Sequence, residues 1–186
     1  MMARVFAMLD FLKTNRALKG EFIPVMDWSE FAAVSSGLAT FGRRRLERRI
    51  AYLATVRVDG SPRLHPVSPF IANGRLFVYM EPASPKAHDL LRDKRFALHC
   101  AVEDNSGGGG EFLITGCGER VIDQGARRLA FEGAAGAGYK PDNRYELFEL
   151  KICSAMSTVY ESGKPKRIRW NASELEASSR DSSLAD

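Results

Sequence analysis

The chain has 186 residues, of which 45% are hydrophobic and 27% are charged, and its formal net charge is +4. This composition is ordinary for one globular domain, and a domain of this size buries roughly 70% of its unfolded surface, so it needs no disulfides or metals as staples. The small positive charge suits an anionic small molecule but is too weak to argue for nucleic acid. No apolar run approaches the ~20 residues of a membrane helix, so we expect a cytoplasmic protein with neither membrane nor nucleic acid as partner.

Residues 1–25 are predicted to be an N-terminal extension or helical arm. Their apolar positions partly fit a helical stripe, but Asp10 interrupts the run and no small-residue cleavage site follows, which argues against a secretory signal. Two interpretations stay open: either Met26 is the biological start, or these residues are an added arm.

Two helices are predicted next. Asp27 is a good cap for a helix over residues 28–34, Gly37 is expected to end it, and a second helix is expected over about 38–49.

The second helix carries five arginines between positions 43 and 49. They form either a nucleic-acid patch or a solvated helix face with Leu46 and Ile50 turned inward. We favour the solvated face because no aromatic side chains are interleaved with the arginines, as they are in single-strand binders.

Three strand-like runs follow, over residues 52–58, 61–72 and 75–80. The dipeptides Asp59-Gly60 and Asn73-Gly74 separate them. Both dipeptides tolerate positive φ, so both are predicted to form two-residue type I′ hairpin turns.

A helix with a well-marked start comes after the third run. Ser84 is a good N-cap, Pro85 suits the first helical position, and Lys86 falls in the first turn. A cation there is unfavourable unless an anion is bound, since this end already carries partial positive charge. Free N–H groups, a hydroxyl and an ammonium together predict a phosphate site.

The remaining elements complete a mainly β fold. The sequence predicts strands over 96–102, 111–121, 145–160 and 164–170, a helix over 123–131, and a disordered polar tail over 171–186. Gly116 and Gly118 are expected to mark a bulge or a close backbone contact. Six or seven strands, mostly joined as hairpins, indicate an antiparallel barrel or sandwich.

The three cysteines, Cys100, Cys117 and Cys153, are far apart in strand-like runs. They are predicted to be buried, reduced thiols rather than a disulfide framework. No His, Cys, Asp or Glu cluster has metal-ligand spacing and no hydrolase motif is present, so we expect no metal and a bound cofactor as the source of any redox chemistry.

The order of these motifs resembles a known family. The succession LATVRVDGSPRLHPVSPFI…GRLFVYM…SPKAHDLLRDKRFALH, within residues 26–170, resembles the pyridoxamine 5'-phosphate-oxidase-like FMN-binding split barrels, and most closely their short actinobacterial-type members. The resemblance implies a six- to seven-stranded antiparallel split β-barrel of FMN-binding type. It also implies a homodimer with the cofactor at the subunit interface, and an oxidoreductase that passes hydride through the flavin to a small-molecule substrate.

The resemblance also assigns site residues. It places a strand segment and Tyr79 beside the flavin, the phosphate on the S-x-K turn, and Glu111 where a later strand reaches the cofactor. The strand segment is His65, Pro66, Val67 and Ser68, and the turn residues are Ser84 and Lys86. The vitamin-making oxidase has an arginine where this chain has His65, so its reaction is not implied.

Several alternatives remain open. A deazaflavin held by the same turn would replace FMN, or the barrel would be a non-catalytic flavin- or haem-binding module with His65, His88 or His99 as axial ligand. Trp170 would either cover a cofactor from the partner subunit or close the barrel.

Overall fold

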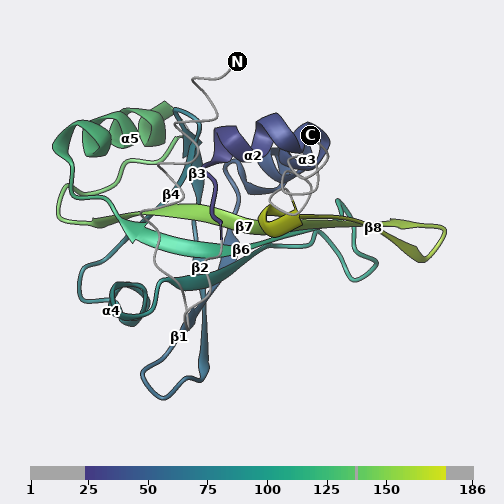
Figure 1. Cartoon of the computed structure of the whole chain (residues 1–186), viewed down its shortest axis with the longest axis horizontal. Helices are drawn as coiled ribbons and strands as arrows, with labels where there is room; N and C mark the ends of the chain where they lie inside the picture. The colour runs from purple at the N-terminus through teal and green to yellow at the C-terminus, as the bar shows by residue number, and fades with distance from the viewer. Residues whose placement is uncertain (1–23, 137, 175–186) are drawn as a thin grey trace, which may run out of the picture.

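The structure is a computed structural model, and it describes residues 24–136 and 138–174. The predicted N-terminal arm, up to residue 23, and the predicted tail from residue 175 onward lie outside the described residues. The tail prediction is wrong for residues 171–174, because Asn171 ends the last strand and Ala172 is buried. The described chain forms one antiparallel sheet with strand order β2-β1-β5-β6-β7-β4-β3, and β8 pairs with β7 (Figure 1). The mainly β fold is confirmed, with eight strands instead of six or seven.

The helices flank the sheet, and their bounds and those of the strands are as follows. The helices are α2 (Trp28–Val34), α3 (Ser36–Leu46), α4 (Pro85–Arg92) and α5 (Gln124–Gly136). The strands are β1 (Ala51–Val56), β2 (Pro62–Val67), β3 (Phe70–Ala72), β4 (Arg75–Met80), β5 (Arg95–Cys100), β6 (Glu111–Arg120), β7 (Glu146–Glu161) and β8 (Lys164–Asn171).

The additional strand arises because the predicted run over 61–72 divides at Ser68-Pro69. Pro69 has no N–H group and cannot extend the ladder between β2 and β1, so the chain leaves that ladder and β3 pairs with β4 instead. β2 and β3 stand at opposite ends of the strand order yet are joined by this dipeptide alone. The sheet must therefore curl until its two ends meet, which is the geometry of a split barrel.

One of the two predicted type I′ turns is confirmed. Asn73 and Gly74 have φ of 49° and 72° and join β3 to β4. The other prediction is wrong, because the register pairs Val56 with Pro62 and leaves an odd number of residues between β1 and β2. A three-residue loop closes that hairpin, with Gly60 at φ 83° donating its N–H to the Arg57 carbonyl.

The first helix has its predicted bounds, but the residue that ends it differs from the prediction. Asp27 caps α2 through a reciprocal capping box with Glu30. The prediction that Gly37 ends this helix is wrong: the break falls at Ser35, whose φ of −142° lies outside the helical region, and Gly37 lies inside α3. Breaking there lets both helices turn buried faces to one core.

The end of α3 also differs from prediction. The helix stops at Leu46, and Arg48 then adopts a φ of 54°. Leu46 is buried as expected, but Ile50 begins the approach to β1 and is 48% exposed. Arg45 is buried and donates a hydrogen bond to Glu103 at 2.7 Å, so this arginine of the run does not belong to the solvated face.

The helix α5 continues to Gly136, beyond its predicted end at Phe131. Tertiary packing accounts for the extension: Ala134 is fully buried, and a Cβ on Gly133 would lie 2.3 Å from the Cβ of Ala72. Close approach to β3 thus holds this glycine-rich turn in the helix.

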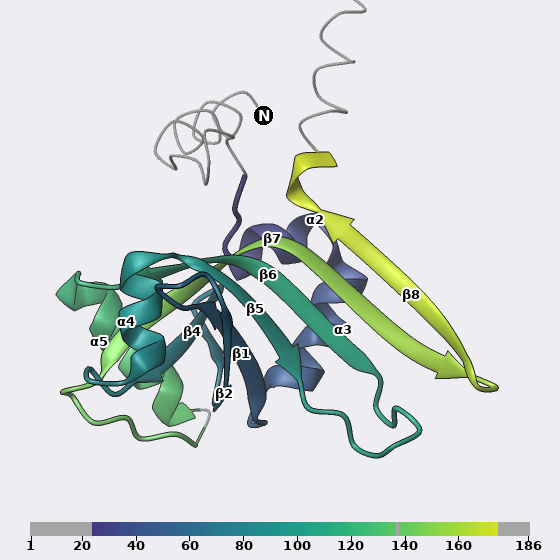
Figure 2. The ribbon, with the colours of Figure 1, turned by 90° about the horizontal axis from the view of Figure 1, so that it is seen from below.

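Two hydrophobic clusters divide the interior. The larger fills the barrel and includes α2 and α3, whereas the smaller lies between α5 and the outer face of β3 and β4. Trp170 packs its ring 4.9 Å from Phe31 at the margin of the larger cluster. Beyond it the β7–β8 hairpin extends away from the body of the molecule (Figure 2).

Candidate functional site

The candidate site lies where the edge strand β2 meets α4. Residues opposite one another in an antiparallel ladder share a face, and β2 pairs His65 with Leu53 and Arg63 with Thr55. Leu53 and Thr55 are buried, so His65 and Arg63 project toward the barrel interior and the helix that closes this end.

The helix α4 is fastened to these strands by Asp89, which is only 3% exposed. Its carboxylate accepts hydrogen bonds from Arg63 Nε at 2.7 Å and Thr55 Oγ1 at 2.9 Å. Burial by itself would raise the pKa of Asp89, but the bonds from Arg63 and Thr55 outweigh it and leave the pKa below its usual value. This carboxylate therefore stays ionised and sets the position of the helix.

The first turn of α4 presents the predicted S-x-K groups. Ser84 is the N-cap with extended backbone angles, and its carbonyl accepts the N–H groups of Ala87 and His88 at 3.0 and 3.2 Å. Its side chain makes no cap bond, and the Oγ atom is buried without a hydrogen-bond partner among the described residues. Lys86 follows in the first turn, where the helix dipole favours an anion.

His65 completes the group. Its Nε2 atom is also buried and has no hydrogen-bond partner within the described part of the chain. Its pKa is lowered, first by burial and then by the positive charges of Lys86 and Arg63, so the two cations stand close to the ring. We call His65, Ser84 and Lys86 the α4 site.

The neighbours of His65 on β2 face different surroundings. Pro66 pairs with Tyr52 on the opposite, exposed face, whereas Val67 points inward and is 7% exposed. Ser68 is exposed and lines a groove of ≈ 630 Å³ between the end of α3, the start of β3 and the end of α5.

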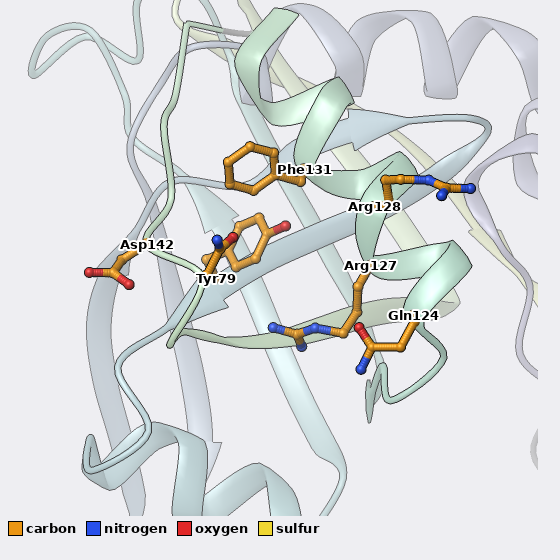
Figure 3. Close-up of a pocket in the computed structure, with 7 residues that line it drawn as sticks. Tyr79, Gln124, Arg127, Arg128, Phe131 and Asp142 are labelled. Atoms are coloured by element: carbon orange, nitrogen blue, oxygen red, sulfur yellow. The ribbon is translucent and has the colours of Figure 1, made fainter.

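Tyr79 lies under α5, on the opposite side of β4 from the core residues Val78 and Met80. Its ring stacks on Phe70 at 5.5 Å, and burial raises its pKa. It lines a cavity of ≈ 340 Å³ together with residues of α5 and the following loop (Figure 3).

The residues that line this cavity contribute no buried side-chain nitrogen or oxygen atom that lacks a partner among the described residues. Arg127 reaches toward Tyr79 in Figure 3, but its guanidinium donates to the carbonyls of Tyr145 at 2.7 Å and Val121 at 3.2 Å. Arg128 points away from the cavity. The structure therefore puts Tyr79 in a different neighbourhood from the α4 site.

Glu111 has a third neighbourhood, at the start of β6. It accepts a hydrogen bond from the Tyr160 hydroxyl at 2.7 Å, and its other oxygen lies 3.9 Å from His99 Nε2. Of the eight predicted cofactor contacts, Ser84 and Lys86 share the start of α4, and the charge of Lys86 acts on His65, while Tyr79 and Glu111 have other partners.

Sequence reasoning missed Asp89, Arg63 and Thr55, which hold the α4 site in place. A signal existed for Arg63, because it alternates with His65 on one strand, but its partner is 26 positions away. His88 is exposed, and no group of three or more potential metal ligands occurs among the described residues. No helix in that part of the chain is long and apolar enough to span a membrane.

The cysteine prediction needs correction. All three thiols are free, but only Cys100 is buried, whereas Cys117 and Cys153 are partly exposed. These two are distant in sequence yet lie near each other, because β6 and β7 are adjacent in the sheet.

Comparison with solved structures identifies the fold. A haem-binding protein from Mycobacterium smegmatis matches with a TM-score of 0.54 and 16% identity over 70% of this chain and 57% of that one. A NimC/NimA family protein from Clostridium acetobutylicum matches with a TM-score of 0.53 and 17% identity over 73% and 93% of the two chains.

A third structure has a TM-score of 0.50 and 14% identity over 79% of this chain and 98% of that chain. It is a Clostridium acetobutylicum protein related to general stress protein 26 of Bacillus subtilis, of the pyridoxinephosphate oxidase family. No family model and no curated protein matches the chain. At these identities the likeness establishes the split-barrel fold alone.

Proposed function

We propose that this chain is a flavoprotein of the pyridoxamine-phosphate-oxidase-like type that binds FMN with its phosphate in the α4 site. The observation that carries the proposal is the pair of buried polar atoms, Ser84 Oγ and His65 Nε2, that have no partner among the described residues. A buried polar group without a partner costs about 1–3 kcal/mol, so two in one place beside a helix N-terminus indicate a missing ligand.

A phosphate monoester supplies what these groups lack. Its oxygens accept from the Ser84 hydroxyl and from the Lys86 ammonium at the start of α4, where the helix dipole also favours an anion. Its negative charge also offsets the repulsion that Lys86 and Arg63 exert on a protonated His65. Asp89 keeps the helix and Arg63 in register without itself facing the anion.

The isoalloxazine ring would then run along Pro66, Val67 and Ser68, whereas Tyr79 and Glu111, the further contacts expected from sequence, have other partners within the same subunit. The groove next to Ser68 provides an opening on that side of the barrel. When bound, the flavin would supply hydride transfer between a reductant and a small-molecule substrate. The chain's own part is to hold the phosphate, orient the ring and limit the access of water.

A homodimer belongs to the same proposal. The outer face of β1 and β2 carries Tyr52 and Leu64, which are 42% and 63% exposed, next to Pro66. An apolar strip beside the proposed ring position favours a second subunit there, because it would shield both the strip and the cofactor from water.

Two other cofactors fit the same groups. A deazaflavin would use the phosphate contacts unchanged. Haem is the second candidate, because an unpartnered His65 Nε2 would serve as an axial ligand, and one structural neighbour is described as haem-binding.

The test is an absorbance and fluorescence titration of the purified protein with FMN, with parallel deazaflavin and haem titrations, and light scattering of the loaded protein. We expect saturable FMN binding, a dimer, and at least a tenfold weaker affinity for Lys86→Ala, since a charge-assisted phosphate contact contributes about 1.5–3 kcal/mol.

Lys164→Ala is the matched control, because Lys164 is an exposed lysine on β8 and far along the chain from the α4 site. Its affinity should equal that of the wild type. An unchanged affinity in Lys86→Ala would refute the phosphate assignment, and a Soret band without flavin binding would favour haem.

A further inference from the structure

A second chemically distinctive cluster lies on β6 and β7, outside the α4 site. Cys117 on β6 and Cys153 on β7 are separated by 36 positions in the sequence, yet they lie on neighbouring strands, close enough for each side chain to shift the pKa of the other. Both are partly exposed, whereas the third cysteine, Cys100, is 1% exposed. The two strands lie side by side in the sheet (Figure 2).

A β-bulge brings the two thiols together. The ladder pairs Cys117 with Lys151 and Gly116 with Ile152, then shifts so that Thr115 pairs with Ser154. Cys153 is the extra residue, without an opposite partner on β6. Ile152 is fully buried in the barrel core, so the alternation of the strand turns Cys153 to the outer face, where Cys117 also lies.

The bulge depends on Gly116. A Cβ at this position would lie 1.8 Å from the Lys151 carbonyl oxygen and 3.2 Å from the Cys153 nitrogen. No other residue permits the backbones to approach so closely, so the pairing of the two thiols is built into β6.

The environment makes the two sulfurs unequal. The neighbouring Cys153 thiol lowers the pKa of Cys117, and Lys94 lowers it further, against the opposing effects of burial and of the Glu119 and Asp93 carboxylates. The pKa of Cys153 is raised by Cys117 and by burial. A partly exposed sulfur with a lowered pKa is the more nucleophilic of the two.

We propose that Cys117 and Cys153 form a redox-active dithiol, with Cys117 as the attacking thiolate and Cys153 as the resolving thiol, that reacts reversibly with low-molecular-weight disulfides. This site is independent of the α4 site and of any cofactor.

The reaction with oxidised glutathione balances as follows. The Cys117 thiolate attacks one sulfur of the disulfide, forms a mixed disulfide and releases one glutathione thiolate. Cys153 then gives up its proton and attacks the Cys117 sulfur, which releases the second glutathione. The dithiol loses two electrons to the glutathione disulfide, and added dithiothreitol reverses the step.

The experiment treats the purified full-length protein with oxidised glutathione, blocks remaining thiols with iodoacetamide, and maps the peptides by mass spectrometry. In the wild type we expect a Cys117–Cys153 cross-linked peptide, alkylated Cys100, and recovery of all three alkylated thiols after dithiothreitol. In Cys153→Ser we expect a stable glutathione adduct on Cys117, because no resolving thiol is present.

Cys117→Ser should form neither product, and Cys100→Ser is the matched control that should cross-link like the wild type. The proposal is overturned if both thiols of the folded wild type remain fully alkylatable after oxidant. It is also overturned if Cys153 instead of Cys117 carries the adduct when each is present alone. Circular dichroism of each variant confirms that the barrel is intact.

Discussion

The α4 site and the cavity under α5 differ in how their polar groups are satisfied. Around Tyr79, the guanidinium of Arg127 is held by two backbone carbonyls, and no lining residue has a buried polar side-chain atom without a partner among the described residues. At the α4 site, Ser84 Oγ and His65 Nε2 are buried and lack partners among the described residues. Proteins rarely leave buried polar atoms without hydrogen-bond partners. The difference therefore favours the α4 site as the place where an anion binds, and the cavity under α5 as a region of ordinary packing.

Within the α4 site, the same comparison distinguishes residues that position the helix from residues that would bind the anion. Asp89 has hydrogen-bond partners on β1 and β2 and holds the helix against these strands. Ser84 and Lys86 instead lie at the start of the helix, where an anion would bind. Substitutions in these two groups should therefore give different signatures, in stability for the first and in affinity for the second.

The largest expected effect is on stability, in Asp89→Ala. Removing one partner of a buried charge pair leaves Arg63 uncompensated, and we expect the free energy of unfolding to fall by about 3 kcal/mol. Urea denaturation measures this free energy of unfolding. Glu47→Ala, which removes the exposed Arg43–Glu47 pair, should change the free energy of unfolding by less than about 0.5 kcal/mol. Equal effects would mean that Asp89 does not fasten the helix.

The same carboxylate predicts a dependence on pH. Because its pKa in the folded protein is lowered, the stabilisation is complete above the unfolded value of about 3.9 and is lost as the pH falls through the lower folded value. Acid denaturation should therefore be steeper in the wild type than in Asp89→Asn, which has no such titration at this position.

The next effect is on affinity, in Ser84→Ala. Losing a hydroxyl that donates to a charged phosphate should weaken FMN binding about five- to tenfold while stability stays near that of the wild type. Fluorescence titration and thermal unfolding measure the two quantities. Ser29→Ala is a control from another N-terminal helix turn and should leave affinity unchanged. An undiminished affinity in Ser84→Ala would show that the orphan hydroxyl is not a phosphate donor.

A smaller effect concerns His65. Its pKa in the free protein is lowered by burial and by the nearby cations, and a bound phosphate should raise it again. Complex formation then takes up a proton, so FMN affinity should rise about three- to fivefold as the pH falls below about 6.5. The ratio of wild-type to His65→Gln affinity cancels the titration of FMN itself, and a ratio independent of pH contradicts the prediction.

The smallest effect is expected for Tyr79→Phe. The ring stack on Phe70 is kept, and the hydroxyl faces a cavity whose lining contributes no unpartnered buried polar atom within the described chain, so FMN affinity should change by less than about twofold. A loss as large as that of Ser84→Ala would mean that the cavity under α5 belongs to the cofactor site, and the contrast between the two regions would fail.

Much of the fold was predictable because its signals are local. The capping box at Asp27, the Asn73-Gly74 turn and the Ser84-Pro85 helix start depend on residues within a few positions of one another. The errors have a common origin in distant contacts. The pairing register of β2 with β1 set the length of the loop after Val56, and packing against Ala72 prolonged α5. Pro69 ended the pairing of the chain with β1, so the next residues paired with β4 as a separate strand.

Sequence alone determined that this chain is mainly β, that its strands form hairpins, and that an S-x-K turn opens a helix after the third predicted strand. Only the tertiary structure decided which groups meet: that His65 stands beside Lys86, that Asp89 reaches Arg63 and Thr55, and that a bulge at Gly116 brings Cys117 to Cys153. The physical reason is the distance along the sequence over which each kind of interaction acts. Turn and cap preferences act within a few residues, whereas burial and hydrogen bonding between strands depend on the register of the whole sheet.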